Sequence, residues 1–404
     1  MKKIVLIVFA LVFGLSIQAQ DKKENVKFKP TIKFNGRVQY DFEFIKPTWN
    51  NITDGEQGIA NFNGNEFRRA YLSAKGKIGK KLGYKIEFEF AGSKIGYRDV
   101  YISYDAGKAG KFAVGSMAEA TGLNMTTSSK YITFMERSML TSFQDFRWGS
   151  GFHYANYKIA DDFTLQASLT NNGNHHGAFQ DKVMENGMNF VARATYAVIN
   201  NKENHSLVHL GVNYDKRQAK TSKLRLENHM GHKYKLGFDA DKRSDLGFEV
   251  ATNFGPLSIQ GEYKMNTNDV DKDVYGQDTY KVNTYYAFVS YFLTGEHRPY
   301  KHGTFGRVKP KHDVDNGGFG ALELAARFSA VDNSDIYKDY ASADSILEPK
   351  GIERNIYKTS NLTFGLNWYL NSHARVMYNT VLTDFSGDNG EKQLAHMIRF
   401  AVDF

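Results

Sequence analysis

The sequence predicts an all-β fold, a transmembrane antiparallel β-barrel of about sixteen strands. Three observations support this prediction: many segments place an apolar residue at every second position, aromatic residues make up 14% of the chain, and the first residues form an export signal. A period of two is that of a strand with one apolar side. Aromatic residues line both membrane interfaces of such barrels. Beyond the first residues no apolar run reaches the roughly 18 residues that a membrane helix needs.

The N-terminus has the pattern of a secretory signal. Lys2 and Lys3 precede an apolar segment at 4–17, and Ala19 supplies the small residue of a cleavage site. An uncleaved membrane anchor is the alternative, but the apolar run is short for a span. We therefore predict a signal peptide at 1–19 and a single barrel domain at 20–404. Loss of the two lysines lowers the formal net charge from +8 to +6, which leaves the mature chain basic.

The last twelve residues alternate clearly. The apolar register consists of Leu394, His396, Ile398, Phe400, Val402 and Phe404. The other register is small or charged, so the segment is a strand with one apolar face. A strand of a soluble sandwich could look the same. In an exported chain we expect it to close a barrel against the first strand, beside Arg37 and Tyr40, with its apolar face toward lipid.

Similar alternation and turn signals divide the rest of the chain. In the segment 82–92, for example, Ile86 and Phe88 oppose Glu87 and Glu89. The sixteen predicted strands are 30–44, 66–79, 82–92, 97–105, 111–117, 149–159, 162–172, 187–199, 206–216, 245–254, 256–266, 279–292, 318–331, 358–370, 373–385 and 393–404. An eighteen-stranded barrel, with two more strands in 217–244 or 293–317, is the alternative.

The lengths of the connections predict the orientation of the barrel. Outer-membrane barrels have short periplasmic turns and longer extracellular loops. Short turns at 79–81, 160–161, 255–256 and 371–372 are therefore expected on the periplasmic side. The basic segment 293–317 then becomes a long periplasmic connection, for which the pattern predicts no role. Only about ten residues separate the signal peptide from the first strand, so no plug domain is expected inside the water-filled lumen.

The connection at 118–148 is predicted to fold into the lumen as a constriction loop. A connection of this length without regular structure is usually functional. It is rich in hydroxyl groups and contains the cations Lys130 and Arg137. Hydroxyls and fixed cations donate strong hydrogen bonds to a desolvated oxyanion. The alternative is that these cations only pair with Glu119, Glu136 or Asp145.

Several segments resemble one known family. They are NEFRRAYL at 65–72, TSSKYITFMER at 127–137, YFLTGE at 291–296, GFGALELAARFS at 318–329 and NWYLN at 367–371. Together they resemble the phosphate-selective porin O and P family, across essentially the whole mature chain. The resemblance implies a homotrimer of sixteen-stranded barrels in the outer membrane. It also implies that anions pass along basic residues to a constriction that contains lysine.

The resemblance also implies candidate residues for anion passage. Arg68 and Arg69 match the paired arginines of the second strand, and Lys130 matches a basic position of the constriction loop. The stretch 216–225 lies where the family places part of a ladder of arginines. Its cations at the extracellular mouth are Arg217, Lys220, Lys223 and Arg225. Lysine lacks the planar fork of arginine, so weaker or less selective phosphate recognition is expected there.

The predicted function is passive diffusion of small anions, such as phosphate or polyphosphate, through an outer-membrane porin. A general, weakly selective pore for small hydrophilic solutes is the alternative. The expected partners are the other subunits of a homotrimer, outer-membrane lipid with lipopolysaccharide, and small anions, with no nucleic acid. No enzymatic activity, cofactor or metal site is expected, because the chain has no cysteine, no GxSxG elbow, no P-loop and no HExxH motif.

Overall fold

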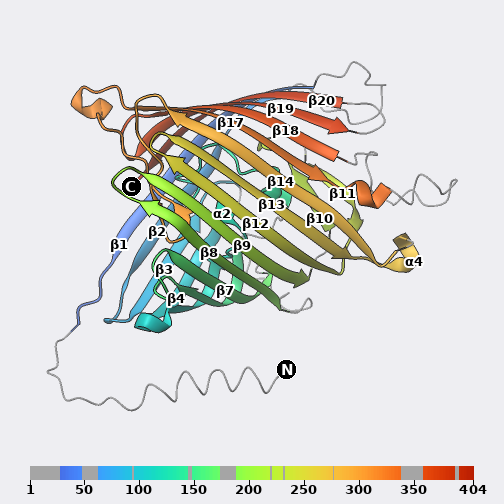
Figure 1. The fold of residues 1–404 in the computed structure, drawn as a ribbon, viewed down its shortest axis with the longest axis horizontal. Helices are drawn as coiled ribbons and strands as arrows, with labels where there is room; N and C mark the ends of the chain where they lie inside the picture. Colours follow the sequence, from blue (N-terminus) through green and yellow to red (C-terminus); the bar gives the residue numbers. More distant parts are fainter. Residues whose placement is uncertain are drawn as a thin grey trace, which may run out of the picture.

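Sixteen strands form one closed antiparallel barrel in which each strand pairs with its neighbours in chain order. The structure is a computed structural model that describes residues 28–47, 62–92, 95–143, 148–172, 188–218, 221–230, 233–275, 277–337, 358–386 and 391–404. The predicted signal peptide at 1–19 lies outside these residues. Figure 1 shows the strands running obliquely around the barrel. The predicted fold class and strand number are confirmed.

The barrel strands are β1 (Lys33–Pro47), β2 (Phe62–Lys77), β3 (Leu82–Glu89), β4 (Gly96–Asp105), β5 (Lys111–Ala118), β6 (Trp148–Asn156), β7 (Phe163–Asn172), β8 (Asn189–Asn201), β9 (Ser206–Gln218), β12 (Lys242–Phe254), β13 (Leu257–Asp269), β14 (Thr279–Phe292), β17 (Ala321–Asp332), β18 (Lys358–Tyr369), β19 (Ala374–Ser386) and β20 (Glu391–Asp403). The connections carry β10 (Thr221–Arg225), β11 (Lys233–Asp239), β15 (Tyr300–Lys301), β16 (Thr304–Phe305), the helices α2 (Leu123–Thr126), α3 (Met139–Phe143) and α4 (Lys272–Tyr275), and the 3₁₀ helices η1 (Gly107–Ala109), η2 (Val314–Asn316) and η3 (Ser334–Tyr337).

The two faces of each strand differ as the alternation predicts. In β17 Leu324 and Phe328 are exposed on the outside, whereas Glu323 and Arg327 are buried on the inside. An apolar outer surface matches the hydrocarbon of a bilayer, and polar side chains line the lumen. In the described part of the chain, no helix has the length and apolar character to cross a membrane.

The barrel closes between its first and last strands. β1 pairs with β20 in a register that places Arg37 opposite Asp403 and Tyr40 opposite Phe400. Phe400, Val402 and Phe404 are all exposed on the outside. The predicted closure and its outward apolar face are therefore confirmed.

The two extra strand pairs do not enlarge the barrel. β10 pairs only with β11, and β15 pairs only with β16. The first pair lies in the connection between β9 and β12, and the second in the connection between β14 and β17. The eighteen-stranded alternative is wrong, because these hairpins are separate two-stranded sheets.

Three connections fill much of the lumen. We name them the constriction loop (119–147, within the predicted 118–148), the hairpin loop (219–241) and, after the side on which it is predicted to lie, the periplasmic connection (293–320). Leu123 of the constriction loop and Phe305 of the periplasmic connection share an apolar cluster with Leu207 of β9. The expectation of a single obstructing connection is therefore incomplete, because alternation identifies strands but does not show where the connections between them fold.

Candidate functional site

The constriction loop is bonded to opposite walls of the lumen. The backbone N–H groups of Leu123 and Asn124 donate to the Glu262 carboxylate on β13, at 2.9 and 2.6 Å. Farther along, the Asn367 amide of β18 donates to the Thr133 carbonyl at 2.8 Å. The loop thus crosses the barrel, and buried wall side chains satisfy its backbone polar groups.

Glu136 is the charged centre of this attachment. Arg68 of β2 donates to both of its carboxylate oxygens at 2.8 Å. Arg69 of β2 and Arg399 of β20 also reach it, at 3.4 and 2.8 Å. Arg399 is in turn held by both oxygens of Asp41, at 2.7 and 2.6 Å. Burial opposes ionisation of Glu136, but the three guanidinium groups outweigh it and hold its pKa well below the usual range.

A β-bulge explains how two adjacent arginines reach one carboxylate. Successive side chains of a regular strand point to opposite faces. The register between β1 and β2 shifts so that Arg69 opposes Gln39 while Phe67 opposes Tyr40. Arg68 is the extra residue of this bulge, so its side chain also enters the lumen. Arg68 and Arg69 therefore attach the constriction loop to the wall.

The other predicted cation of the loop, Arg137, lies within the loop itself. Its guanidinium donates to the carbonyls of Asn124 and Thr127, at 2.9 and 2.8 Å. Arg137 is buried. These bonds hold two parts of the constriction loop together.

Of the predicted cations of 216–225, the structure describes the side chains of Arg217 and Arg225. Arg217 is buried on β9, where it donates to Asp215 at 2.9 Å and to Glu119 of the constriction loop at 3.1 Å. Arg225 is half-buried in β10. Lys220 and the side chain of Lys223 lie outside the described part of the chain.

The hairpin loop crosses to the far wall of the barrel. Its Glu227 pairs with Arg327 of β17, with the closest approach at 2.6 Å, and accepts a hydrogen bond from Thr363 of β18 at 2.5 Å. The backbone N–H of Met230 donates to Glu43 of β1 at 2.8 Å. A second connection thus extends into the lumen, through residues that follow the stretch 216–225 predicted for the extracellular mouth.

The periplasmic connection enters the lumen from the other end. The Gly303 carbonyl accepts a hydrogen bond from Arg193 of β8 at 2.8 Å. Arg298 donates to Gln260 of β13 at 3.2 Å and lies 3.7 Å from the centroid of the Phe305 ring. Burial lowers the pKa of Arg298. The basic segment 293–317, for which the sequence predicted no role, therefore lies inside the barrel below the constriction loop.

A pocket lies between the constriction loop and the periplasmic connection. The empty space at this site, open solvent included, is about 430 Å³. Its charged lining consists of four cations and one carboxylate: Arg37, Lys130, Arg307, Arg375 and Asp403. Arg37 and Asp403 stand on the paired strands that close the barrel. Among the sequence candidates that the structure describes, only Lys130 belongs to this lining.

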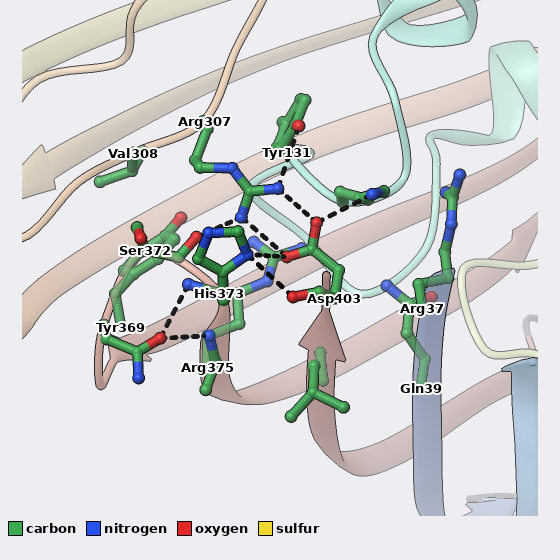
Figure 2. Close-up of a pocket in the computed structure, with 15 residues that line it drawn as sticks. Arg37, Gln39, Tyr131, Arg307, Val308, Tyr369, Ser372, His373, Arg375 and Asp403 are labelled. Atoms are coloured by element: carbon green, nitrogen blue, oxygen red, sulfur yellow. Dashed lines mark hydrogen bonds and ion pairs between the residues drawn. The ribbon is translucent and has the colours of Figure 1, made fainter. Parts of the chain in front are cut away.

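Asp403 is enclosed by donors from two connections. Arg307 forms a fork to its carboxylate, with one contact at 2.8 Å and the other between Nη2 and Oδ2. Lys130 Nζ lies 2.9 Å from Oδ2. Figure 2 shows the Arg307 guanidinium facing the Asp403 carboxylate, with Tyr131 beside it. Arg307 also donates to the Tyr131 hydroxyl at 3.3 Å and to the Ser372 carbonyl.

The remaining two cations of the pocket contact the tip of the constriction loop. Arg37 donates to the Ser129 hydroxyl at 2.5 Å and lies 3.8 Å from Glu87. Arg375 donates to the Ile132 carbonyl at 2.9 Å. Neither bonds to the Asp403 carboxylate as Arg307 and Lys130 do, so among the residues that line the pocket four cations accompany one carboxylate.

The environment of the pocket shifts two of its cations in opposite directions. Burial lowers the pKa of Lys130, and contact with Asp403 limits that decrease. The hydrogen bond to Asp403 raises the pKa of Arg307 above its ordinary value. Both groups are cations at neutral pH.

Sequence reasoning missed Arg37, Arg307, Arg375 and Asp403 as site residues. Arg37, Arg375 and Asp403 do occupy the polar register of predicted strands, and Arg307 lies in the basic segment 293–317. The polar register and the basic composition thus point to these four residues, but they do not distinguish them from the other charged residues of the lumen. Within the described residues, no group of three or more His, Asp or Glu side chains is placed to hold a metal ion.

Known proteins resemble this chain over almost its full length. It is 27% identical to Porin O of Pseudomonas aeruginosa, over 94% of this chain and 88% of that protein. An anion-selective porin from Comamonas acidovorans covers 93% of this chain and all of its own, with a TM-score of 0.55 and 14% identity. OmpT of Vibrio cholerae, solved in a trimer form, covers the same shares with a TM-score of 0.52 and 14% identity. At these identities the two solved structures show the fold alone.

The family model of the phosphate-selective porins O and P matches residues 32–404. This match includes every barrel strand and all three connections that fill the lumen. The chain belongs to the phosphate-selective porin O and P family and is a β-barrel porin of the outer membrane.

Proposed function

We propose that this porin passes small anions and prefers phosphate among them. The observation that carries the proposal is the pocket beneath the constriction loop, whose lining contains Arg37, Lys130, Arg307 and Arg375 but only one carboxylate, Asp403. A ring of fixed cations at a narrow point lowers the energy of an anion and raises that of a cation. The family's description as phosphate-selective and the similarity to Porin O support phosphate as the preferred ion.

The pairing of cations elsewhere in the lumen supports this pocket as the anion-selective part of the pore. Several other guanidinium groups of the lumen lie against carboxylates: Arg193 with Glu249, Arg217 with Asp215 and Glu119, Arg243 with Asp245, and Arg327 with Glu227. Paired charges largely cancel one another for an ion that passes at a distance. The excess of cations in the pocket therefore makes it the selective point of the pore.

Ion currents through the purified protein in planar bilayers test this function. Under a KCl gradient we expect a reversal potential that favours chloride over potassium. We also expect millimolar inorganic phosphate to reduce the chloride current. A preference for potassium would refute the anion pore. A chloride preference without any effect of phosphate would favour the general, weakly selective porin.

We also propose that the protein assembles as a homotrimer in the outer membrane. The trimer form of OmpT, which shares the barrel fold, supports this assembly. The mass of the detergent-solubilised complex, corrected for bound detergent, distinguishes three subunits from one.

Gly303 offers a test of whether the periplasmic connection narrows the pore. It has a φ of +71°, and a Cβ there would lie 2.8 Å from Thr195 Oγ1 and 3.2 Å from Arg193 Nη1. Gly303→Val adds this clash to about 1–2 kcal/mol of left-handed backbone strain. We expect the tip of the connection to leave the lumen and the single-channel conductance to rise.

Gly79→Val is the matched control, because a Cβ at Gly79 meets nothing within 4 Å. Its conductance should equal that of the wild type. If folded Gly303→Val protein also keeps the wild-type conductance, the periplasmic connection does not limit the current.

A further inference from the structure

We propose that Arg307 and Lys130 form an oxyanion site that the chain's own Asp403 carboxylate occupies, and that phosphate enters by displacing this carboxylate. The inference rests on the proposed function, because it assigns the step at which phosphate is held in the anion pore. It adds an intramolecular competitor that sets how tightly phosphate binds.

The donors around Asp403 are those that a phosphate oxygen pair requires. Arg307 presents two N–H groups in a fork to the carboxylate, one of them at 2.8 Å. Lys130 Nζ adds a third donor group, 2.9 Å from Oδ2. A forked guanidinium recognises carboxylate and phosphate with the same geometry. A phosphate that takes the place of the carboxylate can therefore use the same three donors.

The site is accessible from the pocket. The side chains of Arg307 and Lys130 are 21% and 15% exposed, whereas Arg193 and Glu249 of the lumen wall have no exposed side-chain surface. Arg307 and Lys130 lie on connections, and Asp403 is the last residue of β20. A side-chain rotation of Asp403 would uncover the fork without breaking a barrel strand.

The surrounding charges favour the exchange. Arg37 and Arg375 line the same pocket without contacting the Asp403 carboxylate through any bond in the described structure. A phosphate carries more negative charge than the carboxylate at neutral pH, so it gains more from these two additional cations. The Ser372 carbonyl, which also accepts from Arg307, contributes no charge of its own and fixes the guanidinium orientation.

Asp403→Asn removes the competing charge and keeps the shape of the side chain. We expect the concentration of inorganic phosphate that halves the chloride current to fall by about tenfold, because a negative charge next to the incoming anion is lost. Asp384→Asn is the matched control, since it removes a half-exposed carboxylate from β19 that pairs with Lys392. Its half-blocking concentration should equal that of the wild type.

Arg307→Gln, made in the otherwise wild-type chain, provides a second measurement. It removes the fork, so block by phosphate should weaken by roughly tenfold. An Asp403→Asn half-blocking concentration equal to or above that of the wild type overturns the proposal. Unchanged block in folded Arg307→Gln protein overturns it as well, even where Asp403→Asn protein does not fold.

The reversal potential in KCl without phosphate separates the two proposals. A cation-selective wild type refutes the anion pore itself. A chloride-selective wild type in which Asp403→Asn leaves phosphate block unchanged refutes only the competing carboxylate.

Discussion

Lys130→Glu is expected to abolish most of the anion preference of this porin. The substitution replaces a cation 2.9 Å from Asp403 with a second carboxylate. The charged lining of the pocket then changes from four cations and one carboxylate to three cations and two carboxylates. Two charge units about 5 Å from a passing ion raise the energy of chloride by about 2 kcal/mol and lower that of potassium by a similar amount. Chloride permeability alone should then fall roughly thirtyfold, and the chloride-to-potassium permeability ratio should fall further. Reversal potentials in planar bilayers measure this ratio.

Lys108→Glu is the matched control for this substitution. Lys108 is an exposed residue of η1, in the short turn between β4 and β5. The change in net charge is the same, but the charge lies outside the lumen and salt at about 0.1 M screens it over about 10 Å. Equal permeability ratios in Lys130→Glu and Lys108→Glu would show that Lys130 does not set the selectivity.

The strands of the barrel could be predicted because each obeys a local rule. A strand between lipid and a polar lumen must alternate, so Phe400 and Val402 identify the outer face without knowledge of any partner. Closure against Arg37 and Tyr40 then followed from the order of the strands. Neither step depends on a contact between distant connections.

The contents of the lumen could not be predicted in the same way. Glu136 and Arg399 are 263 positions apart in the chain, and nothing in either local sequence indicates the other. Strict alternation also places Arg68 and Arg69 on opposite faces of β2, and only the bulge against β1 brings both inside. The role of Arg68 and Arg69 in anion passage stays a prediction, and their contact with Glu136 could be found only from the structure.

The position of the periplasmic connection could not be predicted for a different reason. Its basic composition was evident, but a connection without periodicity does not indicate which surface it contacts. Arg307 acquires its significance only from Asp403 at the end of the last strand, 96 residues later. The candidate pocket is thus formed by the constriction loop, the periplasmic connection and the paired strands β1 and β20.

Glu136→Gln is expected to be the most destabilising single substitution in the constriction loop. It preserves the size of the side chain but removes the negative charge shared by Arg68, Arg69 and Arg399. Asp41 then remains as the carboxylate that pairs with Arg399 in this cluster. Removal of one partner from a buried ion pair costs about 3–5 kcal/mol, because the remaining charge stays buried without compensation. Unfolding of the refolded barrel in detergent with a denaturant measures this loss.

Glu203→Gln supplies the control, because Glu203 is exposed in the turn between β8 and β9. Its free energy of unfolding should lie within about 0.5 kcal/mol of the wild type, as for most surface substitutions. The single-channel conductance of Glu136→Gln should also rise, since the loop loses its attachment to β2 and β20. Wild-type stability together with wild-type conductance would contradict the role of Glu136 as the anchor.

The difference in stability between the wild type and Glu136→Gln should depend on pH, because the pKa of Glu136 is depressed in the folded protein. A carboxylate whose pKa is lower in the folded than in the unfolded chain stabilises the fold above the unfolded value of about 4.3, and this contribution is lost as the pH falls through the folded value. The wild type should therefore exceed Glu136→Gln in stability by a constant amount between about pH 7 and pH 5. The difference should shrink only in stronger acid, because the three guanidinium groups hold the carboxylate ionised well below its usual range. A difference that vanished near neutral pH would mean that Glu136 is not held as a carboxylate by these arginines.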